Sequence, residues 1–142
     1  MTTIRSFNMF DLLKFNNVNL DIMTETFYTN FYGTYLSKWF EYCVVAENSR
    51  GTIMGYLMGK IEGDKENDIK KNWHGHVTAV TVAPDFRRGG LARQFMDYLE
   101  EVTIQRHNGF FVDLFVRPSN TIAVGMYKQL GYVVYRSVVH YY

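Results

Sequence analysis

The sequence predicts an α/β fold in which helices cover both faces of one mixed sheet. Segments with strand character alternate with helical patterns in the order β-α-α-β-β-β-α-β-α-β. Residues 110–116 form an almost wholly apolar run, which is typical of a central strand. Residues 90–105 have the spacing of a long amphipathic helix, with an apolar face made of Leu91, Phe95, Leu99 and Val102. These patterns favour a single domain over residues 1–142.

Caps, turns and periodicity place the individual elements. The expected strands are 3–7, 42–47, 52–61, 74–82, 110–116 and 132–142. The expected helices are 9–16, 26–36, 90–105 and 121–129. Asn8 and Asn120 have the side chain of a helix N-cap, and Gly131 is suited to end the last helix. Residues 48–51 predict a hairpin turn, and the polar residues 63–72 predict a surface loop.

The composition excludes several classes of partner and location. The 142 residues carry a formal net charge of +1, which gives no reason to expect DNA or a membrane as partner. The single cysteine, Cys43, lies in an apolar run and has no internal disulfide partner, as fits a buried thiol in a reducing compartment. No apolar run approaches the length of about 20 residues that a membrane span requires. We therefore expect a soluble, intracellular protein.

The residues from Val77 to Ala92 carry the clearest chemical signal. They form an expected strand, a tight turn with Gly89 and Gly90, and the start of a helix. A helix start offers unpaired N–H groups and the positive end of the helix dipole to phosphate oxygens. Glycine lets a pyrophosphate approach the backbone, and Arg87 and Arg88 add positive charge. The Walker and dinucleotide fingerprints are absent. From local physics alone, a capped helix with two solvated arginines remains an alternative.

Two motifs resemble those of a known family. Residues 87–92 (Arg-Arg-Gly-Gly-Leu-Ala) match the Arg/Gln-x-x-Gly-x-Gly/Ala motif by which Gcn5-related N-acetyltransferases (GNAT) bind acetyl-CoA, and 120–132 (Asn-x-x-Ala-x-x-x-Tyr-x-x-x-Gly-Tyr) resemble their second signature. The resemblance implies the GNAT fold, in which strands 74–82 and 110–116 splay apart to receive the pantetheine arm. The residues that it assigns to acetyl-CoA are Val80, Val82, Arg87, Arg88, Gly89, Gly90, Leu91, Ala92, Asn120 and Tyr127.

Tyr127 is the candidate catalytic residue. A neutral phenol beside the splayed strands can donate a hydrogen bond or a proton to the departing CoA thiolate. Packing against Met126 and Leu130 is the alternative role. We nominate no carboxylate base, because an α-amine with a reference pKa of about 8 is roughly one-tenth neutral at pH 7.

The resemblance extends over essentially the whole chain. Residues 1–5, 15–21, 24–26, 73–79 and 110–117 are together very similar to catalytic subunits of N-terminal acetyltransferase B (NatB) complexes. This similarity implies acetylation of nascent chains that begin Met-Asp, Met-Glu, Met-Asn or Met-Gln. It also implies cytoplasmic work at the ribosome with a large helical-repeat auxiliary subunit. The aromatic residues from Phe27 to Phe40 would supply the pocket for the initiator Met and a surface for that subunit.

Six residues are expected to contact the peptide. His76 and Thr78 would bond the side chain at position two, although solvent-facing polar residues at a strand edge are an alternative. Glu25 would meet the N-terminal end, and Tyr141 and Tyr142 would close over the peptide backbone unless they are frayed. The sixth residue, Phe27, replaces a family tyrosine, so its hydrogen bond is in question.

Three further expectations complete the interpretation. His74 and His76 lie at i and i+2, but no further ligand cluster accompanies them, so we expect no metal. Family members continue beyond residue 142, so we expect a C-terminally truncated form. The alternative functions are a GNAT enzyme for another amine, such as lysine or a small polyamine, and a catalytically silent acetyl-CoA-binding subunit.

Overall fold

The computed structural model describes residues 2–8, 11, 29–63, 73–87 and 90–134. The strands are β1 (Thr2–Ser6), β2 (Val44–Asn48), β3 (Ile53–Glu62), β4 (His74–Val82) and β5 (Phe111–Leu114). The helices are α2 (Thr29–Lys38), α3 (Leu91–His107) and α4 (Thr121–Gln129), with short 3-10 turns η2 (Phe40–Tyr42) and η4 (Pro84–Phe86). The expected helix 9–16 lies outside the described residues apart from Asp11.

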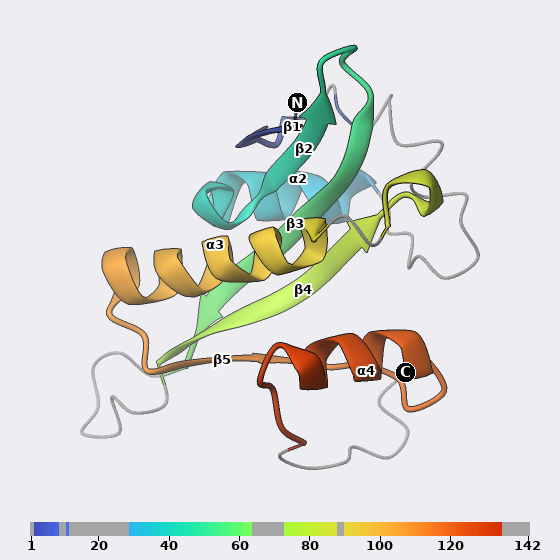
Figure 1. The fold of residues 1–142 in the computed structure, drawn as a ribbon. Helices are drawn as coiled ribbons and strands as arrows, with labels where there is room; N and C mark the ends of the chain where they lie inside the picture. The colour runs from blue at the N-terminus through green and yellow to red at the C-terminus, as the bar shows by residue number, and fades with distance from the viewer. Residues whose placement is uncertain (1, 9–10, 12–28, 64–72, 88–89, 135–142) are drawn as a thin grey trace.

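The five strands form one sheet in the order β1-β2-β3-β4-β5. Strands β1 to β4 pair antiparallel, and β5 pairs parallel with β4. Figure 1 shows α3 crossing one face of the sheet and α2 lying against the other. The predicted mixed sheet with helices on both faces is therefore confirmed. Across the described ranges, no helix combines the length and apolar character that crossing a membrane demands.

Each face of the sheet packs into an apolar cluster. The cluster on the α2 side includes Phe7, Tyr35, Cys43, Val45, Tyr56 and Met58. The cluster beneath α3 includes Leu57, Leu91, Phe95, Met96, Leu99 and Val102. Cys43 is 0% exposed, and burial raises the pKa of its thiol to about 12. The prediction of a plain buried thiol is confirmed.

Glycines on β3 and β4 let α3 approach the sheet closely. A Cβ at Gly59 would lie 2.7 Å from Leu99 Cδ1, and a Cβ at Gly75 would clash with the Thr103 hydroxyl. That hydroxyl lies 2.9 Å from the Tyr42 hydroxyl in a buried hydrogen bond. This close packing fixes α3 against β4, and it thereby fixes where α3 begins relative to the end of β4.

The parallel ladder between β4 and β5 is short. It pairs His74–Val77 with Phe111–Leu114 and ends there, whereas β4 continues to Val82. Figure 1 shows the two strands diverging beyond this ladder, with α4 beside β5. The second half of β4 therefore lacks a strand partner on its β5 side among the described residues. The predicted splay of these two strands is confirmed.

The predicted bounds of β5 are corrected. The strand covers Phe111–Leu114 rather than 110–116. It is the last strand of the described sheet, and its predicted central position is not tested, because the expected next strand lies almost wholly outside the described residues. Separation from β4 after Leu114 removes the backbone partner that would extend it. Its apolar residues have other contacts: Phe111 stacks on His74 with 4.5 Å between ring centroids, and Leu114 packs against the α3 cluster. The expected strand 132–142 lies outside the described residues except for 132–134, which form no strand.

Candidate active site

The start of α3 is built to receive an anion. Its N-cap, Gly90, has φ 80° and ψ 9°, a left-handed conformation that favours glycine. The first bond within the helix runs from Gln94 N to Gly90 O at 3.1 Å. The N–H groups of residues 91–93 therefore have no acceptor inside the helix. Because the N-cap residue is a glycine, no N-cap side chain bonds to them either. With the helix dipole, they form a site for phosphate oxygens.

The other residues of this motif have distinct positions. Arg87 is exposed, and its Nε donates a 3.0 Å hydrogen bond to the Val82 carbonyl, which holds the guanidinium beside the end of β4. Leu91 is buried in the α3 cluster and anchors the first turn, while Ala92 is half-buried. Arg88 and Gly89 lie outside the described residues. A Cβ at Gly90 would meet nothing within 4 Å, so the space above the turn is open to a ligand.

A β-bulge divides β4 into two functional halves. Met58 pairs with Ala79 and Gly59 pairs with Val77, so Thr78 has no opposite residue on β3. The extra residue breaks the period-two alternation of the strand. Val80 and Val82 consequently pack on the α3 side. Thr78 instead donates a 2.8 Å hydrogen bond to the Tyr35 hydroxyl of α2. Residues expected to meet acetyl-CoA and residues expected to meet the peptide thus lie toward opposite faces.

Tyr127 lies on the α3 side of the sheet. It projects from α4, packs against the α3 cluster together with Leu130, and meets Tyr132 edge-on with 6.0 Å between ring centroids. Burial raises the pKa of its phenol to about 12, so the group is neutral and can donate a hydrogen bond near neutral pH. Asn120 caps α4, because its side chain accepts a 3.2 Å hydrogen bond from Ala123 N. The cap predicted for Asn120 is confirmed.

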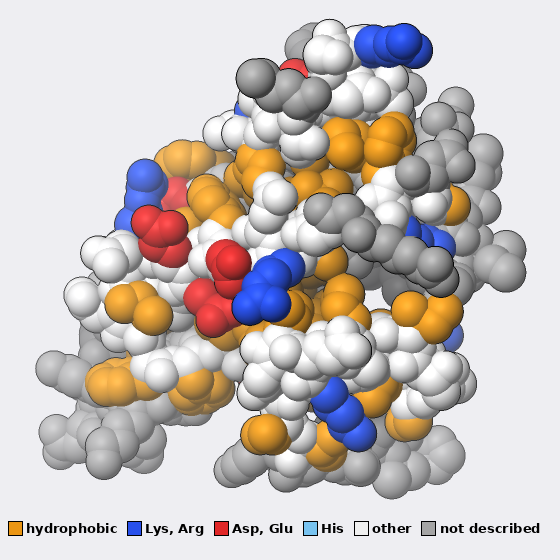
Figure 2. Space-filling model, viewed as in Figure 1, with side chains coloured by type: hydrophobic (Ala, Val, Ile, Leu, Met, Phe, Trp, Pro, Cys, Tyr) orange, Lys and Arg blue, Asp and Glu red, His pale blue; other side chains and the backbone are white. Residues whose placement is uncertain are grey.

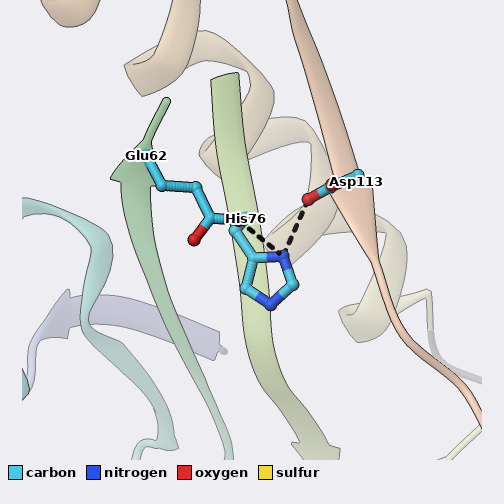
Figure 3. A group of neighbouring side chains, drawn as sticks. All are labelled: Glu62, His76 and Asp113. Atoms are coloured by element: carbon cyan, nitrogen blue, oxygen red, sulfur yellow. Dashed lines mark hydrogen bonds and ion pairs between the residues drawn. The ribbon is translucent and has the colours of Figure 1, made fainter. Parts of the chain in front are cut away.

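His76 lies in a polar cluster on the α2 side of the sheet. Its Nδ1 is 2.7 Å from Asp113 Oδ1 and 3.7 Å from Glu62 Oε1 (Figure 3). His74 Nε2 lies 3.1 Å from Glu62 Oε1 and 3.3 Å from Asp113 Oδ2. The cluster joins three neighbouring strands at the point where β4 and β5 begin to separate.

Asp113 is a functional candidate that the sequence reasoning missed. Burial alone would raise the pKa of its carboxyl, but the hydrogen bond from His76 and the charges of His74, His76 and Lys60 lower it overall. The carboxyl is therefore ionised near neutral pH. One signal was available, since Asp113 is the only charged residue in the run 110–116.

The expectation that no further metal-ligating residues accompany His74 and His76 is corrected. Glu62, His76 and Asp113 each offer one atom within 4.8 Å of the others, so acidic groups do accompany the histidines. Short hydrogen bonds already join the imidazoles to these carboxylates. The absence of a metal remains a prediction. Among the other expected site residues, Glu25, Phe27, Tyr141 and Tyr142 lie outside the described residues.

The molecule has a hollow beside α3 and α4. Figure 2 shows hydrophobic side chains around an opening between the lower part of the molecule, which contains α4, and the part that contains α3. The second half of β4, which has no described strand on its β5 side, provides an apolar wall. The start of α3 provides an anion site, and Tyr127 provides a neutral phenol. These features are the ones expected of an acetyltransferase of mixed α/β fold.

Comparison with known proteins defines the family. The chain belongs to the acetyltransferase (GNAT) family, whose model matches residues 9–132. It is 54% identical over 142 residues to the N-terminal acetyltransferase B complex catalytic subunit NAA20 of Arabidopsis thaliana, covering 100% of this chain and 79% of that protein. A solved structure of the NatB acetyltransferase complex bound to a bisubstrate inhibitor matches with a TM-score of 0.90 and 43% identity, over 99% of this chain and 77% of that one. A NatB complex bound to CoA and MES matches with a TM-score of 0.87 and 43% identity, over 98% and 88% of the two chains.

Proposed function

We propose that this chain is the catalytic subunit of an N-terminal acetyltransferase B complex. Its reaction is transfer of the acetyl group from acetyl-CoA to the α-amine of nascent chains that begin Met-Asp, Met-Glu, Met-Asn or Met-Gln. The observation that carries this proposal is the division of β4 at Thr78. The expected acetyl-CoA residues Val80 and Val82 pack toward α3, whereas His76 and Thr78 interact on the side of α2. Acetyl-CoA and the acceptor peptide can thus approach the separated strands from opposite faces of the sheet.

The residues present fit acetyl-CoA, which supplies a thioester for attack by the amine. The N–H groups at the start of α3 would bind the pyrophosphate, and the open space at Gly90 admits it. Val80 and Val82 would line the path of the apolar part of the pantetheine arm. Tyr127, kept neutral by burial, would donate a hydrogen bond where negative charge develops on the leaving sulfur.

The acceptor amine needs little help to become a nucleophile. An α-amine has a reference pKa of about 8, whereas a lysine side chain has one of about 10.4. The neutral fraction at pH 7 is therefore more than a hundredfold larger for the α-amine. An acceptor α-amine therefore depends less on a general base than a lysine side chain does.

The partners and location belong to the same proposal. We infer an auxiliary subunit of helical repeats, action on nascent chains at the ribosome, and a cytoplasmic location. Phe40, which follows α2 and is 61% exposed, belongs to the aromatic surface that we expect to face this subunit.

The test is acetyl transfer to short peptides that differ in their first two residues, with and without the auxiliary subunit. We expect turnover of Met-Asp, Met-Glu, Met-Asn and Met-Gln peptides, and values of kcat/KM lower by several powers of ten for Met-Leu and Ser-started peptides. Equal kcat/KM for Met-Asp and Met-Leu peptides would refute the B-type assignment and leave the acetyltransferase family intact.

A further inference from the structure

The Asp113 carboxylate faces one nitrogen of the His76 ring. The two residues are paired in the β4–β5 ladder, one position before it ends at Val77 and Leu114. Nδ1 of the ring and Oδ1 of the carboxylate are 2.7 Å apart, the distance of a charge-assisted hydrogen bond. His76 is only 7% exposed, and its ring lies 5.4 Å from that of Phe115. The ring is therefore held by a short bond and by packing.

This contact decides where the ring carries its proton. An ionised carboxylate can only accept hydrogen bonds, so the nitrogen that faces it must be the donor. The neutral imidazole has one N–H, and at His76 it therefore lies on Nδ1. Nε2 is then left with a lone pair. Figure 3 shows this second ring nitrogen pointing away from both carboxylates, in the direction in which β4 and β5 separate.

We propose that Asp113 is a positioning residue for substrate selection, because it holds the proton of neutral His76 on Nδ1 and leaves Nε2 to meet the second side chain of the acceptor peptide. The inference rests on the proposed function. Asp113 itself does not touch the peptide in this arrangement and acts through the imidazole.

The two classes of substrate then need different forms of His76. The amide of Asn or Gln carries N–H donors, so it can bond to the lone pair of Nε2 on the neutral ring. The carboxylate of Asp or Glu has no donor, and its binding requires a second proton on the ring, taken from solvent. The resulting cation would face the carboxylates of Asp113 and Glu62. Acidic substrates should therefore bind with uptake of one proton, and amide substrates without it.

Other charged and titratable groups surround this ring. They are Lys60 and Glu62 from β3, His74 from β4 and Asp113 from β5. On the α2 side, the Tyr35 hydroxyl is hydrogen-bonded to Thr78. Glu62 lies 3.7 Å from Nδ1, too far for a hydrogen bond, and Lys60 Nζ is 3.3 Å from Glu62 Oε2. Asp113 is thus the carboxylate that can fix the tautomer, and Glu62 provides a matched control.

The experiment measures kcat/KM for Met-Asp and Met-Asn peptides between pH 7 and pH 9 in the active full-length protein. Ionisation of the α-amine affects both substrates alike and cancels in their ratio. With one proton taken up, the Met-Asp to Met-Asn ratio should fall by up to about tenfold per pH unit. In parallel, ring ¹⁵N shifts of labelled His76 should show Nδ1 protonated and Nε2 bare in the neutral form.

Asp113→Asn changes the partner of Nδ1 while keeping its shape. Its amide can donate to Nδ1, so the neutral ring can carry its proton on Nε2 and bind a carboxylate directly. We expect the Met-Asp to Met-Asn ratio to lose its pH dependence in this variant, and Glu62→Gln to retain it. A pH-independent ratio in the unmodified protein, or a neutral His76 protonated on Nε2, would overturn this role of Asp113. Both measurements on the unmodified protein remain decisive if Asp113→Asn does not fold.

Failure of this inference is distinguishable from failure of the proposed function. Selection of Met-Asp and Met-Asn peptides over Met-Leu with a constant ratio would overturn only the role of Asp113. Equal rates for all three peptides would refute the proposed substrate rule, whatever tautomer the ¹⁵N shifts report.

Discussion

The Thr78 hydroxyl donates a 2.8 Å hydrogen bond to the hydroxyl of Tyr35, which joins the bulge of β4 to α2. Tyr35 is buried in the α2-side cluster, so its hydroxyl would lose a partner inside the protein if Thr78 were changed. The bond holds the bulge in place beside His76.

A double-mutant cycle tests this bond. Thr78→Val keeps the shape of the side chain and removes the donor, whereas Tyr35→Phe removes the acceptor. Each single change should lower the free energy of unfolding by about 1–3 kcal/mol. The double variant should be less destabilised than the sum, by about 1 kcal/mol, in denaturant titrations. Strictly additive effects would show that the two hydroxyls do not interact.

Gly90→Val should abolish binding of acetyl-CoA. The valine places a branched side chain over the N–H groups at the start of α3, and it also strains the backbone, because φ is 80°. Gly51→Val is a matched control: Gly51 has φ 78° and open space around its Cβ position, but it lies in the β2–β3 turn. Calorimetry should show lost binding only for the Gly90 variant. A folded Gly90→Val protein with unchanged affinity would contradict this placement of the pyrophosphate.

Tyr127→Phe should lower kcat by roughly 10²–10⁴-fold, with little change in affinity for acetyl-CoA. The phenol is the group expected to meet the leaving sulfur, and phenylalanine retains its packing. Tyr132→Phe is the neighbouring control, since the Tyr132 hydroxyl bonds Glu100 at 3.3 Å and its ring also contacts Tyr127. Steady-state rates near those of the unmodified protein for Tyr127→Phe would leave this residue a packing role only.

The sequence was most informative where structure depends on nearby residues. Helix α4 begins after the Asn120 cap and ends before Gly131, which has φ 96°, as the caps predicted. The start of α3 beside paired glycines followed in the same way from local rules. The mixed sheet followed from the order of the elements, since a strand–helix–strand unit favours a parallel pair.

The polar cluster could not be predicted in the same way. Asp113 and His76 are 37 positions apart, and their contact depends on the register of two parallel strands. The bulge at Thr78 depends on how β4 pairs with β3. The period-two pattern of β4 alone would place Thr78 and Val80 on the same face of the sheet, whereas the bulge places them on opposite faces. The aromatic contacts that β5 makes with the two histidines depend on the same register, so the apolar character of 110–116 did not predict them.

The most direct test of the account uses one peptide that carries both kinds of amine. A Met-Asp peptide with an internal lysine is incubated with the protein and acetyl-CoA, and fragmentation in a mass spectrometer locates the acetyl group. The account predicts acetylation of the α-amine and an unmodified lysine, because the α-amine has the lower pKa and lies next to the side chain that His76 meets. Acetyl groups on the lysine, with a free N-terminus, would contradict it.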